Sequence, residues 1–369
     1  MKFRAERDIL VEGFAVVARA ATSRGGLHSA LSGIRMEAGE DRLHLAATDL
    51  DLTIEADVDV HTAEAGTCVL PSRLILDIAR ALEPGAVTVE TGESEATVAS
   101  GRSEFAVRLL PAEEFLRLPE PGEGGVTLPA EDLARALAQV VPAASRDDAR
   151  PILTGVLVEA EGEGLRLVAT DSYRLALRTL PGTHVLEEGQ HVLVPSRALG
   201  ELGRLLGGTE EVRVQLGGDD ARFGVGRVQL TTRLLDGEFP DYRKLIPPSH
   251  PNRLTVGKAA LLDAVRRVKL LARDAAPVRL AFHAEGVRLT AITQDVGQAT
   301  EEVDAKYEGS EMTVAFNPEF LIDGMEATPG EEVVLETLDV LKPAIIRPLA
   351  PDGSGDRHHL YLLMPVRVS

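Results

Sequence analysis

One pattern occurs three times in this sequence at a constant spacing, and this limits the possible folds more than any other feature. Residues 165–180, LRLVATDSYRLALRTL, alternate apolar and polar residues, break at Thr170-Asp171-Ser172 and alternate again. Such a pattern predicts a strand, a tight turn and a second strand. Similar segments begin 122 residues earlier, with LHLAATDLDLTIEADV, and 122 residues later, with VRLTAITQDVGQATEEV. The chain is therefore predicted to be a triplicate.

Three further landmarks follow the same order in each copy. Amphipathic helical patterns open the copies at residues 8–20, 131–141 and 258–273. A second helix is predicted within residues 69–82, 193–206 and 314–326, where the first two segments share Pro-Ser-Arg. Strand-like segments after Phe105, after Val228 and at the C-terminus close the copies. Four landmarks repeated three times in one order make coincidence an unsatisfactory explanation.

The length of the repeat indicates three domains. Solenoid and propeller repeats run about 20–50 residues, whereas a unit of about 120 residues has the size of a domain. Segments rich in proline, glycine and polar residues at 118–129 and 246–256 are typical of linkers. We therefore expect domains at residues 1–122, 123–250 and 251–369.

Composition indicates a globular protein. Of 369 residues, 44% are hydrophobic, enough for a core in each of three domains. No run approaches the roughly 18 apolar residues of a membrane helix, and the N-terminus lacks the apolar core of a signal peptide, so we expect a cytoplasmic protein. Cys68 is the only cysteine, which excludes an internal disulfide or a cysteine-based zinc site. It is expected to be a buried strand residue.

The net charge of −19 argues against an ordinary nucleic-acid-binding protein, which usually has a basic face. Some positive residues are nevertheless arranged in stripes. Arg266, Lys269 and Arg273 share one face of the helix predicted at residues 258–273. In the helices predicted within residues 69–82 and 193–206, two arginines lie seven residues apart. A solvated face of mixed charge is the alternative interpretation of these spacings.

Catalytic motifs are weak. Asp49 and Asp171 lie at matching turns and could act as paired carboxylates in an acidic repeat enzyme. A Thr-Asp turn is explained more simply by side-chain to backbone hydrogen bonds that stabilise the turn. No phosphate-binding loop, nucleophile elbow, zinc-binding helix motif or dinucleotide fingerprint is present. The residues alone therefore leave two alternatives open, a binding protein and an enzyme that uses the two aspartates.

Several motifs together resemble one known family. They are the initial MKF before a helix, ATD, VATDSYRLA, VPSR, RLLDGEFPDYRKLIP, AFNPEFL and the ending YLLMPVR. In this order and at these spacings the sequence resembles the bacterial sliding clamp family, the beta subunit of DNA polymerase III. The resemblance extends from Met1 to Arg367.

The resemblance implies an α+β DNA clamp fold, in which each of three similar domains has helices on one face of antiparallel sheets. Two chains would form a head-to-tail ring around double-stranded DNA. Such a protein is not an enzyme and needs no cofactor; it tethers the replicative polymerase, the clamp loader and repair proteins, which bind it through a short linear peptide. A ring is held by topology, so weak sequence-independent phosphate contacts suffice.

The family pattern also implies three sets of site residues. The DNA-binding residues are expected to be Arg24, Arg73, Arg146, Arg150, Arg197, Arg266 and Lys269, the last two from the basic stripe. The partner-peptide groove is expected to consist of Leu153, Thr170, Ser172, Tyr173, Arg174, Leu175, Pro240, Lys244, Leu245, Asn317, Leu341, Pro343, Leu363, Met364, Pro365, Val366 and Arg367. The dimer interface is expected to contain Ile78, Leu82, Phe105 and Val107 on one side and Leu270 and Leu271 on the other.

Two departures from the family pattern carry expectations of their own. Asp147 and the pair Pro151-Ile152 occupy loop positions that are uncharged and aromatic, respectively, in well-known clamps, so weaker DNA contact is expected there.

Across the dimer interface, Arg102 is expected to pair with Glu301 or Glu302.

Overall fold

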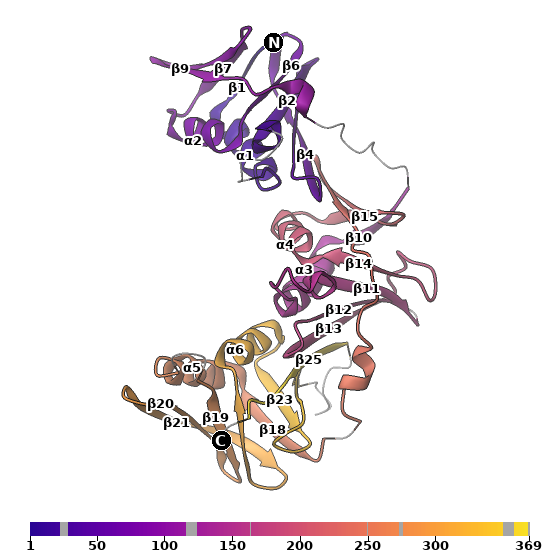
Figure 1. Ribbon diagram of the computed structural model, residues 1–369, viewed down its shortest axis with the longest axis vertical. Coiled ribbons are helices and arrows are strands. Elements are labelled where there is room, and N and C mark those ends of the chain that lie inside the picture. The colour runs from indigo at the N-terminus through magenta and orange to yellow at the C-terminus, as the bar shows by residue number, and fades with distance from the viewer. Residues whose placement is uncertain are drawn as a thin grey trace. The chain divides into compact units, whose positions relative to one another are not determined.

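A computed structural model describes residues 1–22, 29–115, 124–162, 164–248, 250–272, 276–349 and 358–367 (Figure 1). The chain divides into two compact units, which are described separately below. The first unit contains Met1–Glu131 and Arg204–Leu234, and the second contains Asp132–Gly203 and Leu235–Ser369.

The predicted helices are confirmed. In the described residues the α-helices are α1 (Arg7–Val17), α2 (Ser72–Ala81), α3 (Ala130–Val140), α4 (Ser196–Leu205), α5 (Lys258–Lys269) and α6 (Pro318–Ala327). Short 3₁₀ helices are η1 (Ser29–Ser32), η2 (Ala112–Glu114), η3 (Val141–Ala143), η4 (Pro151–Thr154) and η5 (Tyr242–Leu245). Two helices end earlier than the apolar pattern predicted, α1 at Val17 and α5 at Lys269, and each is followed by a turn whose first residue still has right-handed helical backbone angles.

The first unit contains two antiparallel sheets. The smaller sheet has the strand order β5 (His61–Glu64), β1 (Lys2–Glu6), β7 (Ala86–Thr91), β8 (Glu95–Ser100) and β9 (Ser103–Arg108). The larger sheet has the order β10 (Val126–Pro129), β15 (Glu211–Gly217), β16 (Asp220–Val225), β17 (Val228–Arg233), β4 (Leu52–Asp59), β3 (Arg42–Thr48), β2 (Gly33–Gly39) and β6 (Gly66–Pro71).

The second unit contains one long antiparallel sheet. Its first four strands are β14 (His191–Pro195), β11 (Gly155–Glu161), β12 (Gly164–Thr170) and β13 (Arg174–Pro181). The order then continues through β25 (His359–Leu363), β24 (Ala344–Pro348), β23 (Glu332–Thr337), β18 (Asn252–Gly257), β21 (Gly297–Glu308), β20 (Gly286–Thr293), β19 (Val278–His283) and β22 (Met312–Phe316).

The strand orders confirm that the chain is a triplicate. One group of four strands occurs as β1-β7-β8-β9, β10-β15-β16-β17 and β18-β23-β24-β25. A second group occurs as β6-β2-β3-β4, β14-β11-β12-β13 and β22-β19-β20-β21. The last strand of the second group pairs with the last strand of the first group in the following copy. Thus β4 of the first copy pairs with β17 of the second copy, and β13 of the second copy pairs with β25 of the third copy. Hydrogen-bonded sheets therefore continue from one copy to the next.

Helices pack in pairs against these sheets. In the first unit α1 packs on α2 and on β3 and β4, while in the second unit α5 packs on α6 and on β18 to β21. The apolar face predicted for α5 is confirmed, since Leu261, Val265 and Val268 are fully buried. Polar side chains are exposed on these helices, as for Arg73 on α2 and Asp263 on α5.

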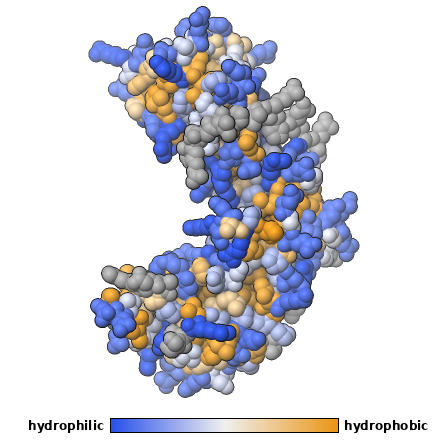
Figure 2. All heavy atoms as spheres, viewed as in Figure 1, coloured by the Kyte–Doolittle hydropathy of each residue, from blue (hydrophilic) through white to orange (hydrophobic). Residues whose placement is uncertain are grey.

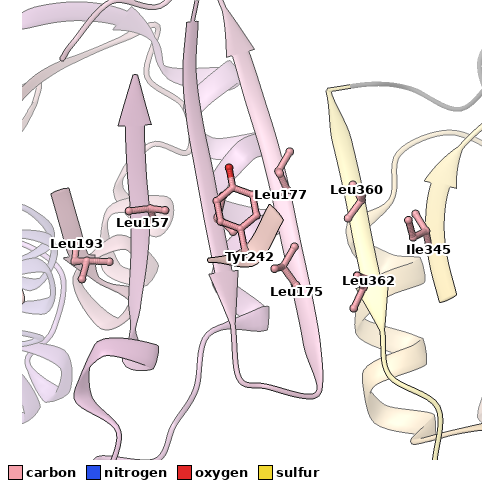
Figure 3. Packing of buried hydrophobic residues seen from close by; sticks show 9 residues of the cluster. Leu157, Leu175, Leu177, Leu193, Tyr242, Ile345, Leu360 and Leu362 are labelled. Carbon is pink, nitrogen blue, oxygen red and sulfur yellow. The ribbon is translucent and has the colours of Figure 1, made fainter. Parts of the chain in front are cut away.

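A hydrophobic cluster lies in the second unit where β13 pairs with β25, a place called the β13·β25 joint below (Figure 3). Leu175 and Leu177 enter it from β13, Leu360 and Leu362 from β25, and Tyr242 from η5. The Tyr242 side chain is almost fully buried, and its hydroxyl group is hydrogen-bonded to Glu159 and Arg166. The chain between β17 and β18 thus crosses the joint and supplies part of its core.

Hydrophilic side chains cover most of the face in Figure 2, and hydrophobic ones form separate patches. None of the helices in the described ranges combines the length and the apolar character needed to cross a membrane.

Candidate functional site

Matching turns connect the hairpins β3–β4 and β12–β13. Asp171 Oδ1 accepts hydrogen bonds from the backbone N–H groups of Tyr173 and Arg174 at 2.9 and 3.0 Å. Asp49 Oδ1 accepts from the N–H groups of Asp51 and Leu52 at 3.2 and 2.9 Å. These are the turn-stabilising bonds predicted from the sequence, and that interpretation of the aspartates is confirmed.

The same turns use backbone conformations that are rare for residues other than glycine. Ser172 has φ of 82°, and Leu50, at the corresponding position of the first copy, has φ of 85°. The Thr170 hydroxyl group donates to the Arg174 carbonyl at 2.6 Å and accepts from the Ser172 N–H at 3.2 Å. These bonds hold the left-handed residue in place and fix the direction in which Tyr173 leaves the turn.

Arg174 connects the turn to two other elements of the second unit. Its Nε donates to Asp171 Oδ2 at 3.0 Å, and its Nη1 contacts Asp323 on α6 and the Tyr361 hydroxyl group on β25. The guanidinium carbon also lies 4.4 Å from the ring centre of Phe320. Burial lowers the pKa of Arg174, but the neighbouring Tyr361, Asp323 and Asp171 raise it more, so the net shift is upward and the group stays charged.

An aromatic and aliphatic surface surrounds this network. Tyr173 is 61% exposed, and its ring stacks on that of Phe320 with 6.3 Å between ring centres. The C-terminal segment lies beside it, because the N–H of Met364 donates to the Tyr173 carbonyl at 2.8 Å and the N–H of Val366 donates to the Ala315 carbonyl at 2.7 Å. The structure thus brings the turn and the C-terminal segment together.

The other residues expected in the groove fall into two groups. Those that support the surface from below are buried: Leu153, Thr170, Leu175, Pro343 and Leu363. Those with exposed or half-buried side chains are Pro240, Lys244, Leu245, Asn317, Leu341, Pro365 and Arg367. Asn317 accepts a hydrogen bond from the Glu319 N–H at 2.9 Å and so caps α6. Lys244 is paired with Asp241 at 2.9 Å.

Sequence reasoning missed Phe320 and Asp323 as neighbours of this site. Ile152 and Phe239 were also missed; both pack against the cluster at the β13·β25 joint together with Met364. The available signal was an aromatic side chain and a carboxylate on α6, three residues apart and therefore on one side of the helix. It could not show that Arg174 would lie against both.

The residues expected to contact DNA are partly neutralised by nearby acids. Arg73 and Arg197 are exposed on α2 and α4, and Arg146 is exposed after η3. Arg150 is also exposed, but its Nε is 3.1 Å from Asp147 Oδ2. Arg24 lies outside the described residues. The expectation of weaker contact at the Asp147 loop therefore has a physical basis.

The basic stripe on α5 is paired with acids on α6. Arg266 lies 2.6 Å from Glu326, and Lys269 lies 2.6 Å from Glu319. Arg273 lies outside the described residues. The prediction of a basic stripe placed Arg266 and Lys269 correctly on one helix face but did not include their pairing with acids. Their positive charge is available to DNA only in part.

The expected interface residues differ in exposure within the single chain. Phe105 is exposed on β9, whereas Ile78, Leu82 and Val107 are buried. Leu270 is 75% exposed and Leu271 is half-buried at the end of α5. The acceptors expected for Arg102 are already engaged in the chain, because Glu301 binds Arg267 at 2.7 Å and Glu302 binds Arg288 and His283.

The architecture defines a DNA clamp fold: three copies of one two-sheet, two-helix domain joined through continuous sheets. Family models of the DNA polymerase III beta subunit match residues 1–119 for the N-terminal domain, 127–241 for the central domain and 243–367 for the C-terminal domain. The chain belongs to the DNA polymerase III beta subunit family, the beta sliding clamps.

Individual relatives and solved structures agree with this family assignment. The chain is 38% identical to the beta sliding clamp of Streptomyces coelicolor and 33% identical to the beta sliding clamp homolog GriR of Streptomyces muensis, over 99–100% of each sequence. The Bacillus subtilis sliding clamp superposes with a TM-score of 0.91 at 30% identity, covering all of both chains. A Pseudomonas aeruginosa clamp solved with griselimycin bound gives 0.91 at 28% identity, also over both whole chains.

The family fixes the general function. The protein is a non-catalytic processivity factor of DNA polymerase III, a homodimeric ring that encircles duplex DNA and tethers the polymerase and other partners. The alternative of an acidic repeat enzyme is wrong, because the family is not catalytic and both aspartates serve as turn acceptors.

Proposed function

We propose that this chain works in the cytoplasm as a processivity clamp built from domains 1–122, 123–250 and 251–369. Three surfaces would carry the function: the subunit interface, the partner-peptide groove and the basic helix faces. The observation that carries the proposal is the repeated strand order, in which, among the described strands, β9 pairs only with β8 and β21 pairs only with β20 over Gly297–Asp304.

The subunit interface follows from the rule that joins successive copies. In the first and second copies the second group of four strands ends at a strand that pairs with the last strand of the first group in the next copy. These pairs are β4·β17 and β13·β25. Among the described strands of one chain, β21 has no partner of this kind in a following copy, and β9 has none in a preceding copy. The rule therefore pairs β21 with β9 of a second chain, head to tail, and two such contacts close a ring.

Both strand edges are available for this contact. Among the described strands β9 pairs only with β8, and β21 uses one edge over Gly297–Asp304, where it pairs with β20. Phe105 lies on β9, while a Leu271 methyl group would be 3.9 Å from a Cβ atom at Gly297. Apolar side chains therefore flank both edges, and pairing the strands would also cover edges that otherwise favour aggregation.

The partner-peptide groove is proposed at the surface around Tyr173, Phe320 and residues 364–367. Exposed aromatic and aliphatic groups can hold the hydrophobic anchors of a peptide, and nearby cations can orient its polar groups. The whole set expected from the sequence is retained in this proposal, with Phe320 and Ile152 added. Synthetic overlapping peptides covering the organism's replicative polymerase can identify the ligand by fluorescence anisotropy.

The basic residues on helices and adjoining loops are proposed to contact DNA phosphates. Arg73, Arg146 and Arg197 are exposed, and the pairing of Arg150, Arg266 and Lys269 with acids keeps the total attraction small. Weak contacts suit a protein that must slide, since strong phosphate binding would hold it in one place.

Retention on nicked circular DNA tests the proposal. The protein is loaded with the organism's clamp loader and ATP, separated from free protein, and followed before and after the circle is cut. Retention on the circle with release after cutting is expected, because only a closed ring is held by topology. Equal retention, or equal salt-sensitive binding to both forms, would contradict it.

A further inference from the structure

The Asp171–Arg174–Asp323 network joins parts of the chain that are far apart in sequence. Arg174 and Asp323 are separated by 149 positions, and both lie in the second unit. The Tyr361 hydroxyl group, which accepts from Arg174 Nη1, donates to the Phe320 carbonyl at 2.9 Å. One side chain of the β12–β13 turn is thus bonded to α6 and to β25.

Asp323 is the part of this network that solvent can reach. Its side chain is 36% exposed, against 8% for Arg174. It lines a cavity of about 320 Å³ together with Arg135 and Gln139 of α3 and Glu326 of α6. A carboxylate in this position stays hydrated on one side while its other side holds the buried guanidinium group.

Among the described residues, the ion pair between this turn and a second helix is seen at the β13·β25 joint. In the second helices of the three copies Asp77, Glu201 and Asp323 occupy the same position, so an acid is present each time. The residue that follows the turn is Arg174 in the second copy but Leu52 in the first, which has no charge to offer. The repeat alone therefore does not explain the pair.

We propose that Asp323 is a positioning residue for the partner peptide. It holds Arg174 against Phe320, and this fixes the stacked Tyr173 ring and the Met364 backbone that is bonded to Tyr173. The proposal rests on the peptide groove proposed above. A surface fixed before binding loses less conformational freedom when the peptide binds, which favours affinity.

Substitutions at Asp323 separate charge, hydrogen bonding and simple packing. Asp323→Ala removes the acceptor and leaves Arg174 with Asp171, whereas Asp323→Asn keeps the shape and one acceptor oxygen. Glu326→Ala is the matched control, because Glu326 is on the next turn of α6, lines the same cavity and binds Arg266 instead of Arg174. All variants are made in the full-length dimer.

The measurement is the Kd of the tightest-binding polymerase peptide, followed by fluorescence anisotropy, with dimer content and Tm recorded for each variant. Asp323→Ala is expected to raise Kd about tenfold and Asp323→Asn about threefold, with dimer content unchanged, whereas Glu326→Ala is expected to bind the peptide with the wild-type Kd. If Asp323→Ala does not fold, the Asn variant decides in the same way.

Three outcomes would overturn the inference. Wild-type affinity in the Asp323 variants would show that the surface does not depend on this residue. An equal loss in Glu326→Ala would indicate a general effect of charge on α6. If the wild-type protein binds no peptide from the polymerase, the proposed groove itself fails and this inference fails with it.

Discussion

Arg150 Nε and Asp147 Oδ2 are 3.1 Å apart, so an arginine expected to contact DNA is paired with an acid three residues earlier in its own loop. The N–H of Ala149 also donates to Asp147 at 3.1 Å. The Ala149 hydrogen bond and then Arg150 lower the pKa of Asp147, so the acid remains ionised near neutral pH. The pair reduces the positive charge that the loop presents.

Asp147→Ser is therefore expected to strengthen binding to a short DNA duplex. Freeing one arginine for a phosphate would make the slope of log K against log salt steeper by up to about 0.9. Fluorescence anisotropy over a range of salt concentrations measures this slope. Asp148→Ser is the control, since Asp148 is adjacent and exposed. Identical slopes for the two variants would contradict the prediction.

The acids on α6 are expected to restrain DNA binding in the same way. Glu319→Gln with Glu326→Gln would release Lys269 and Arg266, and the salt slope should steepen by up to about 1.8. Single-molecule tracking of loaded clamps should also show slower diffusion along DNA. Glu285→Gln is the control, because Glu285 is an exposed carboxylate in the β19–β20 turn and its charge lies outside this helix pair. A matching effect of that control would mean that only net charge matters.

Leu271→Asp is expected to open the ring. A charge beside the β21 edge would be buried without a partner if the strands paired, at a cost of about 2–3 kcal/mol and hence a roughly hundredfold rise in the dimer Kd. Sedimentation over a range of concentrations measures the change. Leu50→Asp places the same charge on an exposed leucine of the β3–β4 turn and should leave the dimer intact. A Leu271→Asp protein that sediments as a stable dimer would place the interface elsewhere.

His44 is expected to stabilise the first unit only in its protonated form. Its Nε2 lies 3.3 Å from Glu55 and its Nδ1 lies 2.9 Å from Asp57; the hydrogen bond to Glu55 is the largest contribution that raises the pKa of His44. Because the folded pKa exceeds the unfolded value, the stabilisation is complete below about pH 6.5 and is lost as pH rises through the folded pKa.

His44→Gln should accordingly lower Tm more at about pH 6 than at about pH 9, with a loss of about 0.5–1 kcal/mol at the lower pH. Differential scanning calorimetry at both values gives the comparison. His184→Gln, which changes an exposed histidine in a loop, serves as the reference. A loss for His44→Gln that does not depend on pH would show that the effect is packing and not charge.

Cys68 should resist thiol reagents in the folded protein. Burial raises the pKa of its thiol to about 12, so almost none of the reactive thiolate is present at neutral pH. Labelling with a chromogenic disulfide reagent should be at least about a hundredfold slower in native protein than in denaturant. Rapid stoichiometric labelling of the native protein would show that the strand β6 opens readily.

The local features of the fold could be predicted from the sequence because they depend on residues close together in the chain. Apolar periodicity gave the six helices, and the Thr-Asp pattern gave the hairpin turns at Asp49 and Asp171, including their side-chain bonds. The constant spacing gave the triplicate. Motifs such as TDSYRL and DGEFPDYRKLIP were enough to indicate the family, and through it the residues proposed for each site.

Contacts between distant residues were decided only by the tertiary structure. The sequence shows acids on α6 and cations on α5, but their pairing as Arg266–Glu326 and Lys269–Glu319 depends on how the two helices pack. Likewise, Arg174 meets Asp323 and Phe320 only because β13 pairs with β25 in one register. Hydrophobic patterns specify which face of an element is buried, whereas sheet register and helix packing determine which charged groups come within bonding distance.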